Sequence, residues 1–524
     1  MPKELSHFNL SLISIVLRNY TGVDANEISM DVGTEIEYNG VMETVPISVS
    51  DIKSLPQALA VIERLLSSMA QLQERIEDLE AENKRLRNQL NVDSHNSSLP
   101  PSSDKGRKRK LTRSLRQKSG RKPGGQKGHI GSTLKQVDRP DRVIVYSVSV
   151  CSDCGQDLSN ARSTELHKRQ VFDLPPLKLE VIEHQAEVKR CPRCTVVNRG
   201  EFPSGVSQPV QYGARVKGLL VYLNQEQLIP YQRTTALFAD LFGQPVSQGT
   251  LLNANRECFE QLAVCENGIK QEIQQAAVVN FDETGLSENG KGIWLHSAST
   301  LTHTHYFAHP KRGKEAMQAG GILPHFQGTA VHDHWESYQS FENCEHAFCN
   351  GHHLRELVRA IEQDDAQWAR EMKHLLLDIK TTVDTAKDEG ELELSVSQID
   401  DFNRQYRDIV NQGLQVYLTQ PIANAPPKRG RKKQSKAKNL LDRLDKYQTQ
   451  TLRFMTDFRV PFDNNQAERD IRMTKVKQKI SGTFRSPSGT PYFCRIRGFI
   501  STLKKQGINA LDALTHTFMP NPPV

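Results

Sequence analysis

The stretch AAVVNFDETG, residues 276–285, decides how this sequence is interpreted. Its short apolar run predicts a buried strand that delivers Asp282 at its end. The turn-prone Thr284 and Gly285 follow, so the carboxylate is placed where one fixed oxygen ligand for a divalent cation is useful. A single aspartate is more often a solvated surface group, and further acids are needed to support a site.

Two later stretches supply those acids. GTAVHDHWESY, residues 328–338, places Asp333 at the end of another short apolar run, and PFDNNQAERDIRM, residues 461–473, places Glu468 among helix formers. Phosphoryl transfer on DNA uses two magnesium ions about 3.5 to 4 Å apart, held by hard carboxylate oxygens. Asp282, Asp333 and Glu468 therefore form a candidate set of ligands for two Mg²⁺ or Mn²⁺ ions.

These residues stand in a wider pattern of motifs. It includes SSLPPSSD (97–104), RKPGGQKGH (121–129), a paired CxxC, CNGHHLREL (349–357) and GTFRSPSG (482–489). From roughly Leu55 to the C-terminus the chain resembles transposases of the insertion sequence 66 family. The resemblance implies a ribonuclease-H-like DDE core with catalysis on Asp282, Asp333 and Glu468, Asp282 bridging both metals. It also implies cleavage at an element end, attack of the released 3′ hydroxyl on target DNA without a covalent enzyme intermediate, and possible accessory proteins.

The motif CNGHHLREL also admits a metal site at Cys349, His352 and His353. Because adjacent histidines on one helix point in different directions, we favour polar surroundings for the carboxylates, with His353 or Arg355 contacting a phosphate. Ordinary packing remains open.

Charge and cysteine content bound the class of protein. A length of 524 residues is enough for several domains. The net charge of +7 suggests an anionic partner. Nine cysteines, four of them in CxxC pairs, favour a metal site over a disulfide framework. The apolar run Leu10–Leu17 is too short to span a bilayer, so we expect a cytoplasmic protein without a membrane partner, associated with the nucleoid when bound to DNA.

Residues 1–54 have no assignment, and a heptad repeat marks residues 55–92 as a leucine zipper. Two series of core positions follow the seven-residue spacing: Leu65, Leu72, Leu79 and Leu86, with Ile62, Met69, Ile76, Asn83 and Leu90. In a parallel dimer Arg75 would face Glu80 of the other chain, and Glu82 would face Arg87. One amphipathic helix packed within its own chain is the alternative.

Residues 93–135 form a basic linker, since Lys105–Lys127 holds eleven Lys and Arg and no acid. Phosphate contact and a solvated spacer both fit this composition, and we favour DNA contact. The candidate contacts there are Arg107, Lys108, Arg109, Lys110, Arg121 and Lys122.

Residues 136–205 predict a zinc ribbon. Strand-like runs at 142–150 and 177–189 precede the pairs Cys151/Cys154 and Cys191/Cys194, and four thiolates satisfy one structural Zn²⁺. Unrelated reduced cysteines are the alternative.

Residues 206–272 are predicted to be helical. We expect helices at 216–225 and 231–242, and a third helix capped by Ser247. This resembles a helix-turn-helix that would read DNA near Gln248, Thr250 and Asn253, and plain helical packing explains it equally well.

Residues 273–524 are expected to form the catalytic domain. After Asp282, two strands make a meander, Lys314–Leu323 forms a crossover helix, and Asp333 falls on a fourth strand parallel to the first, which would bring the two acids together. A helical insertion, about 357–452, separates Asp333 from Glu468, with an apolar stripe at Trp368, Met372, Leu375, Leu376 and Ile379.

Two further groups of basic residues are candidates for DNA contact. Arg429 and Arg431 lie in a basic loop of the insertion that suits a minor groove or a solvated tether. Arg472 and Lys475 share a helix face with Glu468, whose alternative role is an ion pair with Arg472.

The sequence thus predicts a multidomain α/β protein, homodimeric or larger, that joins element ends to target DNA. Two other functions remain open: a non-catalytic zinc and coiled-coil DNA-binding regulator, and a nuclease that cuts without joining.

Overall fold

The computed structural model describes residues 55–93, 95–97, 134–419 and 434–519. The chain divides into two units, residues 1–87 and 88–524, which are described separately. The unassigned segment 1–54 and eight of the basic candidates lie outside the described residues: Arg107, Lys108, Arg109, Lys110, Arg121, Lys122, Arg429 and Arg431. Among the helices of the described part, none is long and apolar enough to cross a membrane.

Helix α2 runs unbroken from Leu55 to Leu90, which confirms the helix predicted from the heptads. Its leucines at the repeated core position remain about half exposed within the chain, at 46% for Leu72 and 51% for Leu79. An apolar stripe that stays exposed within one chain is what a seam between two chains requires. The two-stranded coil itself stays a prediction.

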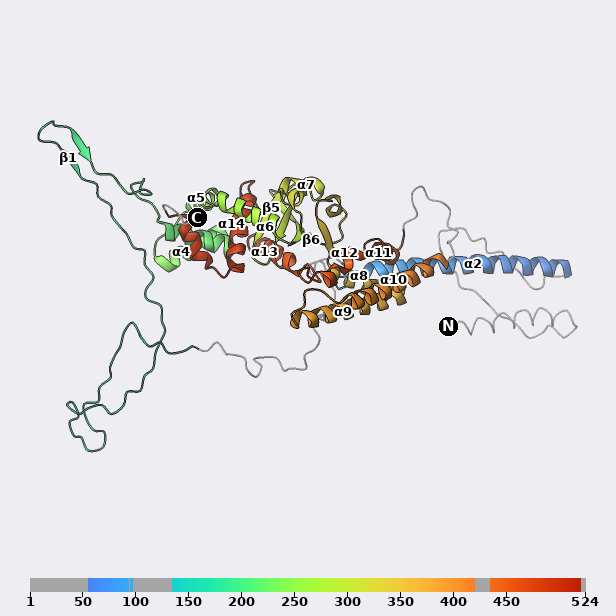
Figure 1. The fold of residues 1–524 in the computed structure, drawn as a ribbon, viewed down its shortest axis with the longest axis horizontal. Coiled ribbons are helices and arrows are strands. Elements are labelled where there is room, and N and C mark those ends of the chain that lie inside the picture. The colour runs from blue at the N-terminus through green and yellow to red at the C-terminus, as the bar shows by residue number, and fades with distance from the viewer. Residues whose placement is uncertain (1–54, 94, 98–133, 420–433, 520–524) are drawn as a thin grey trace, which may run out of the picture. The chain divides into compact units, whose positions relative to one another are not determined.

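Five strands form one mixed sheet in the order β5-β4-β3-β6-β7 (Figure 1). The strands are β3 (Val278–Glu288), β4 (Lys291–Ser299), β5 (Thr304–His309), β6 (Thr329–His332) and β7 (Glu345–Phe348). β3, β4 and β5 are antiparallel neighbours, whereas β3, β6 and β7 pair in parallel. The meander, the crossover helix α7 (Lys314–Gly320) and the parallel pairing of the first and fourth strands are therefore confirmed.

The predicted positions of the first two acids within their strands need correction. Asp282 does not end its strand, because β4 pairs with β3 as far as Glu288 and places Ser297 opposite Asp282. β6, however, pairs only with Val278–Asn280, so Asp282 lies just beyond the point where β3 loses its parallel neighbour. Asp333 is the first residue after β6 rather than part of it.

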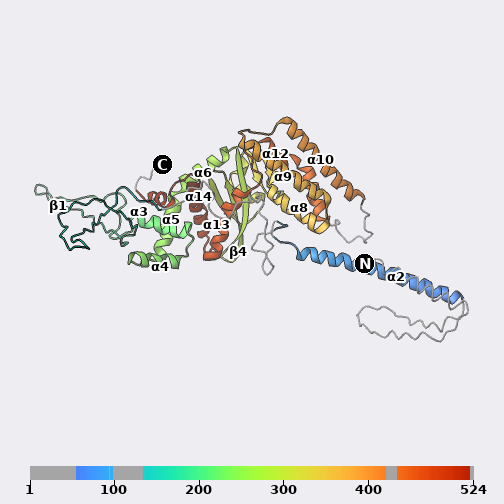
Figure 2. The ribbon, with the colours of Figure 1, turned by 90° about the horizontal axis from the view of Figure 1, so that it is seen from below.

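The two faces of β3 pack against different helices. Val279 and Phe281 join a core with α7 and with α6 (Ala263–Gln275), while Leu286 joins a core with α13 (Asn465–Ser481) and α14 (Gly489–Lys505). Because side chains alternate along a strand, Asn280 and Asp282 face α13 together with Leu286. The sheet thus has helices on both faces. Figure 2 shows α6, α13 and α14 beside the strands.

The predicted helical insertion is a bundle that packs on the β6–β7 edge of the sheet (Figure 2). Its members are α8 (Asn350–Asp364), α9 (Gln367–Asp388), α10 (Val396–Thr419), α11 (Lys436–Lys446) and α12 (Gln448–Thr456). The five stripe residues on α9, from Trp368 to Ile379, are all buried, which confirms the stripe. Val331 of β6 and Ala347 of β7 belong to the same core.

The helices predicted before the sheet are present. They are α3 (Ala214–Val221), a π-helical turn η3 (Tyr222–Glu226), α4 (Tyr231–Phe242) and α5 (Gln248–Gln261). The backbone N–H of Thr250 donates to Ser247 Oγ at 3.0 Å, so Ser247 caps α5 as expected. Val221 and Cys258 of this region share a core with Ile496 of α14 and Leu514 of α15 (Ala510–Thr517). The helices of 206–272 are thus built onto the C-terminal helices.

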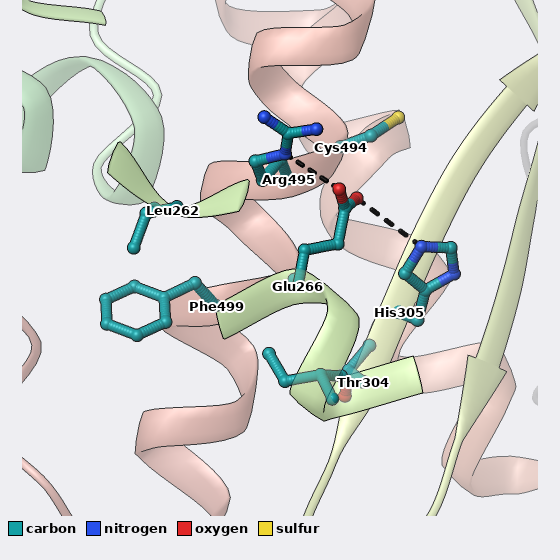
Figure 3. Close-up of a pocket in the computed structure, with 9 residues that line it drawn as sticks. Leu262, Glu266, Thr304, His305, Cys494, Arg495 and Phe499 are labelled. Atoms are coloured by element: carbon teal, nitrogen blue, oxygen red, sulfur yellow. Dashed lines mark hydrogen bonds and ion pairs between the residues drawn. The ribbon is translucent and has the colours of Figure 1, made fainter. Parts of the chain in front are cut away.

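A partly buried ion pair joins α6, β5 and α14 beside a small cavity (Figure 3). Glu266 accepts a hydrogen bond from Arg495 Nε at 2.7 Å and lies 3.4 Å from His305 Nε2. Burial raises the pKa of Glu266, but His305 and Arg495 outweigh it and lower that pKa to about 2. With a volume of about 10 Å³, the cavity has room for one water and none for a substrate.

Candidate active site

An asparagine at the start of α13 fastens that helix to the strand that carries Asp282. The Asn464 side-chain amide donates to Phe281 O at 2.7 Å, and its oxygen accepts a hydrogen bond from the Asn280 amide at 2.8 Å. Asn is a common N-cap residue, but Asn464 makes no side-chain capping bond to α13 because its side chain bonds to β3. Glu468, one turn further along α13, is thereby held on the face of β3 that carries Asp282.

Asp282 is partly buried and has other carboxylates near it. Its pKa is raised well above 3.8, first by burial and then by the negative charges of Glu283, Glu468 and Asp333. The backbone N–H of Glu283 donates to Asp282 Oδ1 at 2.9 Å and opposes the shift. The fold therefore brings the three predicted acids within electrostatic reach of one another, in an arrangement that is unfavourable until a cation balances it.

Asp333 and Glu468 are both partly exposed, so solvent reaches the site from their side. The backbone N–H of Trp335 donates to Asp333 Oδ1 at 2.9 Å, and Arg312 lies 3.9 Å from Oδ2. Glu468 pairs with Arg355 of α8 at 3.3 Å, and the ion pair with Arg472 that was the alternative role is not found among the described residues. Arg355 comes within reach because the start of α8 is hydrogen-bonded to the residues just before α13, through Asn350 N to Phe462 O and Asn464 N to Cys349 Sγ. The spacing of residues in the sequence does not show this contact.

Sequence reasoning missed a second buried acid next to the first. Glu283 points to the opposite face of β3, where it accepts hydrogen bonds from Arg312 Nε at 2.8 Å and Tyr338 Oη at 2.6 Å. The Arg312 guanidinium lies 3.8 Å from the ring centre of Trp335 and 5.0 Å from that of Trp294. Arg312 thus connects Glu283 to Asp333. The alternation of side chains along a strand could have placed Glu283 on the face opposite Asp282. Its hydrogen-bond partners, Arg312 and Tyr338, lie far away in the sequence and could not be predicted in this way.

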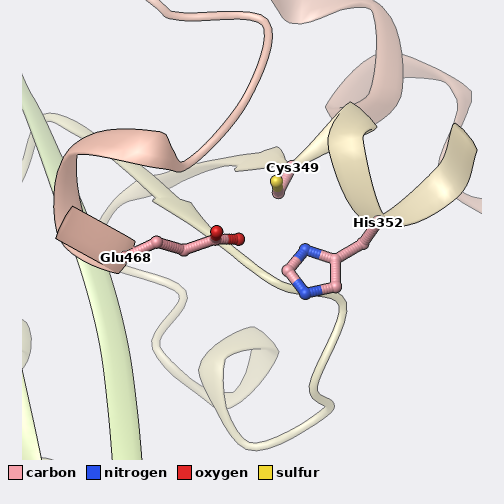
Figure 4. Close-up of side chains that lie close together, drawn as sticks. All are labelled: Cys349, His352 and Glu468. Atoms are coloured by element: carbon pink, nitrogen blue, oxygen red, sulfur yellow. The ribbon is translucent and has the colours of Figure 1, made fainter. Parts of the chain in front are cut away.

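The residues of CNGHHLREL separate into two groups. His353 is buried, and its Nδ1 lies 3.1 Å from Asn350 Oδ1, so it is not placed to contact a phosphate. Cys349, His352 and Glu468 instead place one ligand atom each within 4.8 Å of one another (Figure 4). Burial raises the pKa of the Cys349 thiol to about 12 and lowers that of His352 to about 3, so both are neutral side chains at pH 7.

The remaining candidates for DNA contact differ in their surroundings. Arg472 is exposed on α13. Lys475 is half-buried and donates to Gly285 O at 2.6 Å, which reduces its availability to a phosphate. Gln248 and Asn253 are exposed on α5, and Thr250 is partly exposed. Arg472 and the outer face of α5 therefore remain accessible, whereas Lys475 serves to join α13 to β3.

The four predicted zinc ligands form two matching turns. Gly155 N donates to Cys151 O and Thr195 N to Cys191 O, at 3.0 and 2.9 Å. Backbone N–H groups within each turn lower the pKa of Cys151 and Cys191, which favours thiolates. The predicted long strands are wrong, since only β1 (Val188–Arg190) and β2 (Val197–Arg199) form around the second pair and a single bridge, Val150 to Asp157, around the first.

The ribbon segment has no buried core that would join its two turns. Most of its apolar side chains are exposed, among them Val143, Val171 and Val181 at 75–90%, and Leu179 packs on the core of the following helices instead. In the described chain, no three of its sulfurs lie within 4.8 Å of one another. Metal–thiolate bonds are the interaction by which such a segment assembles.

The donor sets suit two different kinds of cation. Asp282, Asp333 and Glu468 offer hard carboxylate oxygens, the ligands that Mg²⁺ and Mn²⁺ prefer, and the repulsion seen at Asp282 is what a divalent ion relieves. The cysteines of the two turns offer soft sulfur, which suits Zn²⁺.

Three family models match parts of this chain. Residues 149–195 match the zinc-finger binding domain of transposase IS66, and residues 46–135 match a family of unknown function, DUF6444. No curated protein matches the chain. Residues 209–491, which include the sheet, the helical bundle and all three acids, match the Transposase IS66 family. Because this match covers more than half of the 524 residues, the chain belongs to the IS66 transposase family.

Proposed function

We propose that this protein binds the ends of a DNA element and catalyses their metal-dependent cleavage and transfer into target DNA. The observation that supports the proposal is the approach of Asp333 and Glu468 to Asp282, whose pKa is raised by burial and then by Glu283, Glu468 and Asp333. Among the described residues, the ligand atoms of the three acids do not all lie within 4.8 Å of one another before a cation is bound. Structural carboxylates on a surface repel weakly and stay solvated. The negative charges of Glu283, Glu468 and Asp333 near the Asp282 carboxylate are unfavourable unless a cation is part of the function.

In this proposal the sheet is the ribonuclease-H-like core of a DDE enzyme. Asp282, Asp333 and Glu468 would hold two Mg²⁺ or Mn²⁺ ions, with Asp282 contributing to both. When bound, such ions activate the attacking oxygen and stabilise charge on the transferred phosphate. Asn464 would fix the distance between Glu468 and Asp282, because it joins α13 to β3 by two hydrogen bonds.

Two arginines are suited to hold DNA phosphates at this site. Arg355 has a side chain that is 30% exposed and is paired with Glu468, and Arg312 has one that is 36% exposed and reaches toward Asp333. A guanidinium beside a metal-ligating carboxylate can transfer a hydrogen bond to a phosphate oxygen when the metal takes over the carboxylate charge. These arginines would orient the backbone of the cleaved strand.

Labelled element ends incubated with target DNA and Mg²⁺ test the proposal directly. A transposase yields ends joined covalently to the target. A nuclease yields cut ends only, and a regulator yields bound but intact DNA. Joined products that persist without any divalent cation would contradict the role given to the three carboxylates.

The ribbon gives a prediction that is independent of catalysis. We expect one tightly held zinc at Cys151, Cys154, Cys191 and Cys194, and we expect Cys151→Ser to lose it with local unfolding of residues 136–205. Elemental analysis and limited proteolysis measure both effects. Cys265→Ser, at an exposed cysteine outside the CxxC pairs, is the control. Equal zinc in Cys151→Ser and the parent would show that the ribbon does not hold the ion.

Helix α2 gives a prediction about assembly, since joining two element ends requires two active sites in one complex. The exposed seam would pair two chains in parallel. Leu72→Glu with Leu79→Glu places charge in that seam and should convert the dimer to a monomer and reduce paired-end joining more than single-end binding. Sedimentation velocity measures the oligomeric state, and Ala81→Glu, at an exposed position on the side of the helix opposite the seam, is the control. A doubly substituted chain that stays dimeric would remove the coil from the assembly.

A further inference from the structure

One cluster of metal-ligating atoms contains residues that the three-carboxylate site does not use. Cys349 Sγ, one imidazole nitrogen of His352 and one carboxylate oxygen of Glu468 all lie within 4.8 Å of one another. Figure 4 shows the three side chains pointing toward a common space, from the start of α8 and from the first turns of α13. His352 Nδ1 is buried and has no hydrogen-bond partner among the described residues.

The chemistry of this set differs from that of the three acids. One thiolate, one imidazole and one carboxylate form a three-residue set of the kind that zinc takes in open sites, where a fourth position is left to water or substrate. Mg²⁺ disfavours sulfur and requires near-octahedral oxygen. Tetrahedral zinc bonds of about 2.0–2.3 Å place ligand atoms about 3.5 Å apart, so small side-chain rotations close the site.

Backbone N–H groups near Cys349 oppose the effect of burial, which raises the pKa of the metal-free thiol. Cys349 is the residue before α8, and Asn464, the residue before α13, donates its backbone N–H to Cys349 Sγ at 3.1 Å. Two helix N-termini therefore meet at this sulfur, and each favours negative charge there. His352 follows Cys349 by three residues, and this spacing keeps the two side chains on one side of the first turn.

We propose that Cys349, His352 and Glu468 bind one Zn²⁺, and that this ion shares Glu468 with the carboxylate site. Binding releases the thiol proton to solvent, and the ion takes the place of Arg355 as the positive partner of Glu468. The site is distinct from the ribbon, whose ligands are four cysteines between residues 151 and 194.

The shared glutamate has a functional consequence, which rests on the proposed function. Glu468 committed to zinc beside Cys349 is withdrawn from Asp282 and Asp333. Zinc at this site should therefore hold the enzyme in a state that does not cleave DNA until the ion leaves.

The binding test uses the full-length protein after incubation with excess zinc chloride and removal of unbound metal by gel filtration. We expect the parent to retain one zinc per chain more than Cys349→Ser, which preserves the size of the side chain and its hydrogen bond from Asn464. His352→Ala should lose the same ion. Cys344→Ser, a neighbouring buried cysteine outside the cluster, and His374→Ala, an exposed histidine on α9, should retain the parent count. Equal counts in the parent and Cys349→Ser would overturn the proposal.

A second measurement needs no variant and decides the case if Cys349→Ser does not fold. The parent, with its ribbon already filled by zinc, is titrated with cobalt(II) chloride, and one further equivalent should give a thiolate-to-cobalt absorption band. Titration without such a band would exclude a thiolate ligand outside the ribbon and would overturn the site.

The consequence is tested by adding zinc to the magnesium-supported joining reaction, each protein being compared with its own zinc-free rate. The zinc concentration that halves joining should rise roughly tenfold or more in His352→Ala. Unchanged sensitivity would show that the ion does not act through this site. If the parent joins no DNA at all, the proposed function fails while the zinc counts still test the site.

Discussion

Asp282→Asn, Asp333→Asn and Glu468→Gln are each expected to abolish cleavage and joining while leaving DNA binding largely intact. Each replacement keeps the shape of the side chain and removes a negative charge that a divalent ion requires. Losing several kcal/mol of transition-state stabilisation corresponds to a rate decrease of about a thousandfold or more. Single-turnover assays with labelled ends in Mg²⁺ measure the rate, and gel-shift titrations measure the binding.

The stability of Asp282→Asn separates lost chemistry from lost folding. Because the folded-state pKa of Asp282 lies well above 3.8, the folded protein binds a proton there more tightly than the unfolded chain does. Asp282 therefore destabilises the metal-free protein progressively as pH rises from about 4 through that raised pKa, and the full penalty is present above it. Asn carries no charge, so Asp282→Asn should melt at or above the parent temperature at neutral pH without metal.

Asp378→Asn, at an exposed aspartate on α9, is the control, with parent rates and an unchanged melting temperature. If any of the three site variants joins DNA at the parent rate, its assignment is wrong. If Asp282→Asn melts well below the parent, the burial of Asp282 is structural and the charge repulsion argument fails.

The sequence located the two strands and the helix that carry the acids, because these depend on local pattern. Short apolar runs before Asp282 and Asp333 and helix-forming residues around Glu468 are visible without any tertiary information. The parallel pairing of β3 with β6 followed from the crossover between them. Because side chains alternate along a strand, Asp282 lies on the opposite face of β3 from Phe281, which packs against α6 and α7.

The contacts that shape the site could not be predicted in the same way. The Asn464 side chain bonds to β3 rather than to its own helix, and Glu468 pairs with Arg355 rather than with Arg472. In both cases the partner lies more than a hundred residues away in the sequence. Local spacing offered the shorter-range partner in each case, and tertiary packing overrode it. Cys349 and His352 were recognisable as metal-binding residue types, but their third ligand lies on α13 and not at His353.

The largest effect on stability away from the acids is expected at Arg497 of α14. Arg497 and Glu226 are both about 5% exposed, and they form an ion pair that connects α14 to the π-helical turn η3. The same guanidinium Nη1 lies 3.2 Å from Glu226 O and 3.4 Å from Gln225 O, carbonyls at the end of that turn. Lys504 also pairs with Glu226, but its side chain is 53% exposed. Arg497 is thus the buried partner of a buried carboxylate.

Arg497→Met is expected to cost about 3 kcal/mol of folding free energy, because it leaves Glu226 buried with one solvent-exposed partner and removes hydrogen bonds from two carbonyls. Lys504→Met should cost less than about 1 kcal/mol, since that lysine is half in solvent. Urea unfolding, followed by a probe on the sheet and its covering helices, measures both. Adding Glu226→Gln to Arg497→Met should restore part of the loss, because the uncompensated charge is gone. A double variant as unstable as the sum of its two single variants would show that the cost of Arg497→Met is lost packing, and that the charge of Glu226 does not need Arg497.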